Sequence, residues 1–269
     1  MNKILKDLAS GALCTAIDAN QIEEHTSFGC GEGAELHTDP DMTWIFTGIP
    51  YPIFNGVLCA RLSQDTAHER IEETISYFKY RNIPMMWWTG PCSQPPDLGN
   101  YLQAHGLVFA GEQPGMALDM ETLNDNPPLP EGLSIEHVQN EEDLKHWTGA
   151  VQNGFNLPKF VAKALFDHFA ALGLTKNHPR RHYVGRLHGE PVASATLFLG
   201  AGVAGLYYIA TMKKARHRGI GTAMTLIPLL EARQMNYRIG VLQASELGLG
   251  VYRQIGFKEY CTLGRYLCV

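Results

Sequence analysis

The chain has 269 residues, which is long enough for two domains of ordinary size. Its net charge of −5, from 22 basic and 27 acidic residues, argues against nucleic acid as a general partner, because phosphate binding needs a basic surface. Its apolar runs fall short of the ~20 residues that cross a membrane, so we expect no membrane partner. The six cysteines are scattered without a C-x-x-C pair, which predicts reduced thiols, a cytoplasmic location and no metal site.

A change of composition at residues 121–131, ETLNDNPPLPE, predicts a linker, because prolines and turn-forming residues replace the apolar periodicity there. It divides the chain into an N-terminal domain of residues 1–120 and a C-terminal domain of residues 132–269. Residues 1–13 combine one short apolar patch with Asp7 and are interpreted as a helix rather than a signal peptide.

The C-terminal domain alternates between strand-like and helix-like segments, which predicts an α/β (α+β) fold. Glycine-bearing turns at residues 188–190 and 200–202 indicate antiparallel hairpins. Pro228 predicts a kink or a local break in a long helix. The expected strands are 133–138, 182–187, 191–199, 204–211, 239–244 and 257–269, and the expected helices begin at Asn140 and span 157–172, 222–235 and 247–254.

The most informative segment is Arg216–Gly221, RHRGIG, between a predicted strand and a predicted helix. Two glycines let the backbone approach a ligand closely, and a helix start adds unpaired N–H groups and a partial positive charge. Such a place suits a phosphate, so the segment predicts an anion-binding loop. The flanking Lys213 and Lys214 are better explained as a solvated charged turn.

The N-terminal domain repeats the ending of the C-terminal one. The segment 98–107 parallels 249–257, and each follows an apolar strand candidate. The first copy has residues 63–70, SQDTAHER, in place of the glycine loop, and its two acids would repel an anion. Aligning Gly106 with Gly256 puts Leu102 at the position of Tyr252. We therefore expect a duplicated fold in which only the second copy keeps its chemistry.

In order along the chain, three features resemble the GCN5-related N-acetyltransferase (GNAT) superfamily. They are the strand Tyr208–Thr211, the segment Arg216–Gly221 followed by Thr222, and Ser245, Tyr252 and Gly256–Phe257 about thirty residues later. The resemblance covers roughly residues 131–269. It implies two tandem GNAT-like domains, each a mixed, mostly antiparallel twisted sheet flanked by helices, with a degenerate N-terminal copy.

The resemblance also implies acetyl-CoA as co-substrate. Its pyrophosphate would lie on the loop amides of Arg218, Gly219, Ile220, Gly221 and Thr222. The pantetheine arm would pair like an extra strand with Ile209, Ala210 and Thr211, which is sensible where strand-edge groups are exposed. Arg216 and Arg218, with His217 between them, would meet phosphate. Ser245 is expected mainly to cap the helix near Glu246, and it would also touch the cofactor.

Acetyl transfer needs a proton for the leaving thiolate, whose pKa resembles that of cysteine, about 8.5. The resemblance implies that Tyr252 is this acid; the competing interpretation is a half-buried tyrosine that packs its helix on the sheet. Backbone N–H groups near Ala210 would hold the oxyanion. The strand before the loop has no carboxylate for a base. Two candidates for this base remain. One is Glu246, for which a first-turn helix acid is the competing interpretation, and the other is water relayed by Tyr207 or Tyr208.

Three further segments receive simpler interpretations. Trp87–Trp88 is expected in the core, and residues 176–182 as a solvated loop. Residues 152–156, QNGFN, lie where this superfamily often places acceptor contacts, so they are a candidate acceptor segment.

Two functions are open. The leading hypothesis is an acetyl-CoA-dependent N-acetyltransferase that transfers the acetyl group directly, in a ternary complex, to an amine of a small molecule or a protein. The alternative is a non-catalytic acyl-CoA-binding or sensing module. A nucleoside-triphosphate enzyme is disfavoured because the chain lacks G-x-x-x-x-G-K-[ST].

Overall fold

The computed structural model describes residues 3–175 and 178–268, which form two compact units. The C-terminal unit comprises the residues up to Asn20 together with Met116–Lys258, and the N-terminal unit comprises Gln21–Gly115 together with the residues from Glu259 onward. Each unit is thus assembled from two pieces of chain, whereas the sequence predicted one division at residues 121–131.

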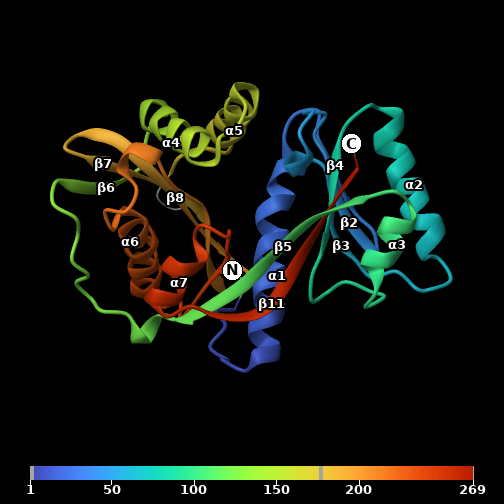
Figure 1. Ribbon diagram of the computed structural model, residues 1–269, viewed down its shortest axis with the longest axis horizontal. Coiled ribbons are helices and arrows are strands. Elements are labelled where there is room, and N and C mark those ends of the chain that lie inside the picture. The colour runs from blue at the N-terminus through green and yellow to red at the C-terminus, as the bar shows by residue number, and fades with distance from the viewer. Residues whose placement is uncertain (1–2, 176–177, 269) are drawn as a thin grey trace. The chain divides into compact units, whose positions relative to one another are not determined.

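The strands of the C-terminal unit follow the hydrogen-bonded order β5-β10-β9-β8-β7-β6, and β5 contributes its residues 116–119 to this unit. The pairs β6–β7, β7–β8 and β8–β9 are antiparallel, and β10 is parallel to β9. The strand bounds are β5 Val108–Asp119, β6 Leu133–His137, β7 Arg180–Leu187, β8 Glu190–Gly200, β9 Val203–Thr211 and β10 Ile239–Gln243. The helices are α4 Glu141–Phe155, α5 Lys159–Leu172, α6 Ile220–Gln234 and α7 Leu249–Ile255, with short 3-10 turns at Met120–Thr122 and Lys213–Ala215 (Figure 1).

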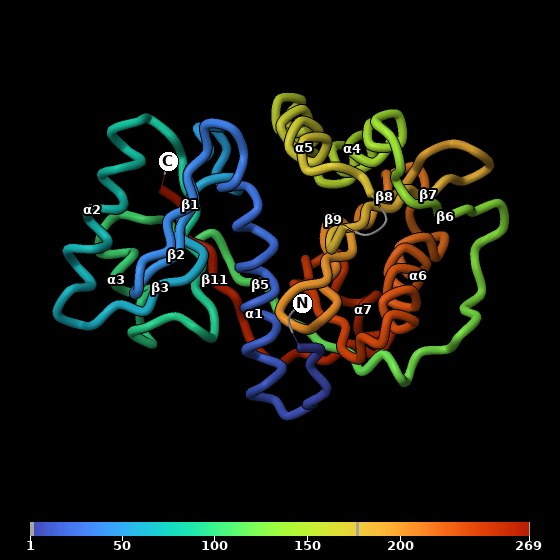
Figure 2. The backbone as a smooth tube through the Cα atoms, turned by 180° about the vertical axis from the view of Figure 1, so that it is seen from behind, coloured from blue at the N-terminus to red at the C-terminus, as the bar shows by residue number. Residues whose placement is uncertain are grey.

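Local sequence explains the two hairpins of this sheet. His188 and Gly189 have φ of 51° and 85°, and Ala201 and Gly202 have φ of 48° and 75°. Two consecutive residues with positive φ make the tight turn whose twist matches antiparallel strands. Strand β8 is buried along almost its whole length because α4 and α6 both pack against it, and Figure 2 shows them on opposite sides of β7–β9. Both predicted hairpins are confirmed.

The structure confirms one of the helix predictions and differs from two others. The side chain of Asn140 accepts the N–H of Asp143 at 2.9 Å, so α4 begins as predicted. The break predicted at Pro228 is absent, because α6 runs as one helix whose buried face, including Pro228, packs into the core. The helix predicted over residues 1–13 is wrong for residues 3–9, because α1 (Ser10–Thr26) begins only at Ser10 and the backbone N–H of Leu5 pairs instead with the carbonyl of Gly202 at 2.9 Å.

The strands of the N-terminal unit follow the hydrogen-bonded order β1-β2-β3-β4-β11. Helices α2 and α3 share a hydrophobic core with these strands. Trp87 is fully buried and Trp88 almost so, which is the core position predicted for both. The bounds are β1 Glu35–Thr38, β2 Met42–Phe46, β3 Gly56–Ala60, β4 Met85–Thr89, β11 Lys258–Cys268, α2 Ala67–Tyr80 and α3 Leu98–Ala104, with 3-10 turns at Ser27–Cys30 and Pro52–Phe54.

The same order of elements occurs twice along the chain. Strand β3, helix α2, strand β4 and helix α3 are followed by β5, just as β9, α6, β10 and α7 are followed by β11. In both series the first two strands are parallel partners. The closing strands are exchanged: β11 pairs with β4, and β5 lies next to β10. The pairing of β11 with β4 explains why the N-terminal unit includes the residues from Glu259 onward. The tandem fold class predicted from the sequence is confirmed.

Candidate functional site

The two parallel strands of the C-terminal unit part soon after they meet. The described pairs between β9 and β10 are Ala204 with Gly240 and Gly205 with Val241. Strand β9 nevertheless continues to Thr211, with β8 as its partner on the other edge. The stretch Leu206–Thr211 therefore presents a strand edge beyond the reach of β10. An extended ligand that carries amide groups can pair with such an edge.

A bulge interrupts β9 in this stretch. Tyr208 has φ of 51°, and the register against β8 shifts between Ser194 and Thr196. The buried Ser194 hydroxyl donates a 2.8 Å hydrogen bond to the carbonyl of Tyr208, and the indole N–H of Trp147 donates to the carbonyl of Ala195 at 3.0 Å. A bulge changes the direction of the backbone groups that follow, here those at Ala210.

The glycine loop joins the end of β9 to the start of α6. Gly219 directly precedes the helix with φ of 75° and ψ of 0°, a left-handed conformation that favours glycine. The helix begins at Ile220, two residues earlier than predicted, so the N–H groups of Ile220, Gly221 and Thr222 belong to its first turn and have no acceptor within the helix. A Cβ added at Gly221 would lie 3.9 Å from the nearest atom outside its chain neighbours and its own helix backbone, Oγ1 of Thr211. This loop fits a phosphate group.

The basic side chains of the loop differ in their contacts and exposure. Arg216 Nε donates to the carbonyl of Thr211 and its Nη2 to the carbonyl of Gly154, both at 3.0 Å, so this side chain ties the loop to β9 and α4. The sequence predicted phosphate contact for Arg216, not this bracing role. His217 and Arg218 are exposed. Lys214 forms an exposed ion pair of 2.7 Å with Glu190, as expected for a solvated turn.

Tyr252 lies in α7 and is 8% exposed, within the core of the C-terminal unit. Burial raises the pKa of its hydroxyl to about 12, so the group stays protonated at neutral pH. The ring packs edge-on against Phe257, with centroids 5.9 Å apart. A Cβ added at Gly248 would lie 2.7 Å from the same ring. Tyr252 thus has the packing role considered for it and also carries a proton that it can donate.

The turn before α7 corrects one prediction. Ser245 Oγ accepts the N–H of Gly248 at 3.2 Å, and the Ser245 carbonyl accepts the N–H of Leu249 at 3.0 Å. Ser245 therefore closes a turn, and α7 begins at Leu249 rather than near Glu246. Because Glu246 is exposed and lies in this turn, it is not a first-turn helix acid.

The two tyrosines considered as water relays lie in different surroundings. Tyr207 donates a 2.7 Å hydrogen bond to Oδ1 of Asn20, a buried residue of α1 whose amide also donates to the carbonyl of Gly200. The Tyr208 ring packs edge-on against Trp147, with centroids 5.3 Å apart. Asn20 was missed from the sequence because nothing local links it to a strand 187 positions away.

The predicted acceptor segment lies beside the glycine loop. Gly154 of α4 approaches β9 so closely that an added Cβ would lie 2.5 Å from Cβ of Ala210. Asn156 ends the helix in a left-handed conformation. An open pocket of ≈ 510 Å³ is lined by polar, apolar and basic side chains: Gln152, Asn153, Asn156, Leu157, Met212, Lys213 and Lys214. The structure thus joins residues 152–156 to the end of β9.

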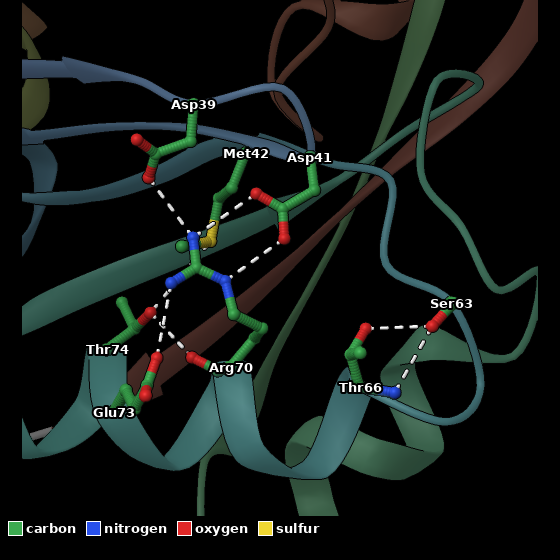
Figure 3. Close-up of polar contacts among 8 residues, drawn as sticks. All are labelled: Asp39, Asp41, Met42, Ser63, Thr66, Arg70, Glu73 and Thr74. Atoms are coloured by element: carbon green, nitrogen blue, oxygen red, sulfur yellow. Dashed lines mark hydrogen bonds and ion pairs between the residues drawn. The ribbon is translucent and has the colours of Figure 1, made fainter.

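The corresponding stretch of the N-terminal unit has a different character (Figure 3). Its Arg70 guanidinium contacts the carboxylates of Asp39, Asp41 and Glu73 at 3.0 to 3.2 Å. Ser63 Oγ accepts the N–H of Thr66 at 3.2 Å, just before α2 begins. Three carboxylates thus surround the Arg70 guanidinium, and the Ser63 hydroxyl already accepts a hydrogen bond from a loop N–H. These contacts favour the predicted lack of an anion site in the first copy.

The described residues, 3–175 and 178–268, contain no group of three or more histidine, cysteine, aspartate or glutamate side chains that could hold a metal ion. They also contain no helix with the length and apolar character needed to cross a membrane. The predicted loop at 176–182 lies partly outside this range, at Lys176 and Asn177.

Comparison with known proteins supports this description. Residues 144–257 match the acetyltransferase (GNAT) family. A GCN5-related N-acetyltransferase from Kribbella flavida superposes with a TM-score of 0.71 at 16% identity, over 92% of this chain and 94% of that one. A tandem GNAT protein from the clavulanic acid biosynthesis pathway superposes with a TM-score of 0.61 at 13% identity, over 99% and 97%. A search of curated proteins returned no match.

The two structures share the fold over nearly the whole chain, and the family match lies within the C-terminal unit that contains the parted strands and the glycine loop. Residues 144–257 therefore belong to the GNAT acetyltransferase family, within a chain that has the tandem GNAT fold.

Proposed function

We propose that this protein is a cytoplasmic, acetyl-CoA-dependent N-acetyltransferase that acts on an amine of a small molecule or a protein by direct transfer in a ternary complex. The observation that carries the proposal is the parting of β9 and β10 next to the glycine loop and the start of α6. A strand edge and a set of helix N–H groups are adjacent there, as a long ligand with amides and a diphosphate requires.

Each group of residues has a distinct part in the proposal. The N–H groups of residues 218–222 bind the diphosphate, Ile209–Thr211 pair with the amide-bearing arm, and the exposed Arg218 adds a positive charge. When bound, acetyl-CoA supplies an acyl group activated as a thioester. Tyr252 holds a proton for the departing sulfur, and its buried hydroxyl keeps that proton at neutral pH.

The acceptor side of the proposal rests on residues 152–156 and on the bulge of β9. Backbone N–H groups near Ala210 would stabilise negative charge on the acyl oxygen, because the bulge re-aims them. Glu246 and a water held by Tyr207 or Tyr208 remain the candidate bases. Glu246 is exposed in the turn that precedes α7, so bulk water also reaches it.

The first copy of the fold is proposed to be degenerate, so that one chain binds one coenzyme A. Arg70 is held by three carboxylates in the first turn of α2, the helix that corresponds to α6 of the second copy. Calorimetric titration of the full chain with coenzyme A is expected to give one site per chain. A second site that survives mutation of the glycine loop would contradict this proposal.

The decisive experiment separates an enzyme from an acyl-CoA sensor. A panel of amines is assayed for release of coenzyme A thiol, with the native chain and with Tyr252→Phe. We expect Tyr252→Phe to lower kcat by roughly 10²- to 10⁴-fold and to leave the Kd for coenzyme A almost unchanged.

Tyr101→Phe provides the matched control, because Tyr101 lies in α3 of the first copy, the helix that corresponds to α7. Its turnover is expected to equal that of the native chain. Tight binding of acetyl-CoA without turnover on any amine would instead support the sensing module.

A further inference from the structure

Two cysteines of the N-terminal unit lie side by side although 33 positions separate them in the chain. Cys59 belongs to β3, and Cys92 lies in the turn that follows β4. Their sulfur atoms are 2.7 Å apart, and both side chains are half-buried. This pair could not be predicted from the sequence, which contains no C-x-x-C motif.

The backbone holds both cysteines in place. The segments that follow Cys59 and Cys92 are joined by two backbone hydrogen bonds. The N–H of Gln94 donates to the carbonyl of Ala60 at 2.9 Å, and the N–H of Leu62 donates to the carbonyl of Gln94 at 3.0 Å. The turn that carries Cys92 is closed by the N–H of Gly90, which donates to Ser93 Oγ at 2.9 Å. Because neither segment has to move far, bond formation between the two sulfur atoms costs little conformational entropy.

We propose that Cys59 and Cys92 form a redox-sensitive pair that a small disulfide oxidant converts to an intramolecular disulfide. The thiolate of one cysteine attacks the oxidant, forming a mixed disulfide and releasing one thiol. The thiolate of the second cysteine then attacks the protein sulfur and releases the other thiol. The two cysteines lose two electrons and two protons, and the oxidant is reduced to two thiols.

Half-burial is consistent with a reversible pair. A small disulfide can reach sulfur that is partly exposed, and a dithiol reductant can reverse the reaction. The pair lies in the N-terminal unit, so the inference does not depend on the proposed acetyltransferase activity. A closed bond would link β3 to the turn after β4 and restrain the loop of chain between them in the unfolded state.

The test compares the full chain after dithiothreitol with the chain after oxidised glutathione. Thiols are counted in denaturant, and the oxidised chain is digested without reductant for mass spectrometry. We expect two fewer thiols than the six of the reduced chain, a linked peptide containing Cys59 and Cys92, and a midpoint of thermal unfolding raised by several degrees.

Cys30→Ser is the matched control, because Cys30 is exposed and its sulfur donates to the carbonyl of Thr26 at 3.6 Å. It should still lose two thiols on oxidation, whereas Cys59→Ser and Cys92→Ser should not form the linked peptide. Cys59→Ala and Cys92→Ala serve if the serine variants fail to fold. Retention of all six thiols in the native chain, glutathione attached to a single cysteine, or a different linked pair would overturn the proposal.

Discussion

The buried hydroxyl of Ser194 donates a hydrogen bond of 2.8 Å to the carbonyl of Tyr208, the residue with positive φ at the centre of the β9 bulge. This contact joins β8 to β9 where their register shifts. It holds the bulge two residues before Ala210, near which the proposed oxyanion-binding N–H groups lie. The direction of those groups therefore depends on a side chain of the neighbouring strand.

Replacement of Ser194 by alanine should reduce turnover more than it reduces cofactor binding. The variant removes the hydrogen bond from Ser194 to the Tyr208 carbonyl and relaxes the bulge. We expect kcat to fall roughly tenfold, while the Kd for coenzyme A changes less than about threefold. Ser134→Ala is the control, because Ser134 is exposed and bonds only to Glu136 in the described contacts. Equal losses in kcat and affinity would contradict a role confined to the bulge.

Gly221→Ala tests the glycine loop without disturbing the protein around it. The added Cβ would lie 3.9 Å from Oγ1 of Thr211 without a clash, so stability should stay constant or rise by up to about 1 kcal/mol through helix propensity. Affinity for coenzyme A should nevertheless fall about tenfold, because the methyl group occupies space needed by the diphosphate. Gly149→Ala in α4, also with open space around the Cβ, should leave affinity unchanged. Unchanged affinity in Gly221→Ala would remove the diphosphate from this loop.

Arg216 and Arg218 should separate into a stabilising and a binding residue. Arg216→Ala removes two hydrogen bonds to backbone carbonyls and should lower the free energy of unfolding by about 1–3 kcal/mol. Arg218→Ala removes an exposed cation and should leave stability unchanged, while affinity for coenzyme A falls about fivefold. Urea unfolding and calorimetry on both variants measure the two effects. An Arg218→Ala variant with native affinity would show that this side chain does not contact phosphate.

Glu231 should make stability depend on acid pH. Burial raises the pKa of this carboxyl, but hydrogen bonds from His137, Tyr183 and Arg181 outweigh burial and lower it to about 2. Because the unfolded value is about 4.5, this stabilisation is complete above that pH and is lost as pH falls toward 2.

Substitution of Glu231 by glutamine should therefore destabilise the protein by about 2 kcal/mol at pH 7, and the difference from the native chain should shrink below pH 5. Urea unfolding across pH measures the effect. Glu190→Gln removes an exposed ion pair with Lys214 and should leave stability unchanged at every pH. A difference between Glu231→Gln and the native chain that stays constant down to pH 3 would refute the assignment.

Ionisation of the Tyr252 hydroxyl should lower stability only at alkaline pH. Burial raises its pKa from 10 to about 12, so the unfolded chain ionises first as pH rises. Stability is unaffected by this group below pH 10 and falls between pH 10 and 12. Tyr252→Phe should thus lose less stability across that interval than the native chain, as measured by chemical unfolding. Parallel losses would mean that the hydroxyl is hydrated in the folded state.

Several features follow from the sequence because they depend on neighbouring residues. Gly219 needs a left-handed backbone before α6, His188–Gly189 and Ala201–Gly202 make tight turns, and Asn140 caps its helix. These are local requirements for particular φ angles or side-chain acceptors, so sequence alone locates the glycine loop and the hairpins. The repeated ending of the two copies likewise indicated the tandem arrangement.

Tertiary structure alone decided the rest. The Ser194–Tyr208 bond, the Asn20–Tyr207 bond and the Cys59–Cys92 pair each join residues far apart in the chain. The exchange of β5 and β11 depends on which sheet edge each strand meets, and the position of Glu246 depends on a turn closed by Ser245. The physical reason is that local conformation is set by neighbouring residues, whereas these contacts exist only after packing has brought distant segments together.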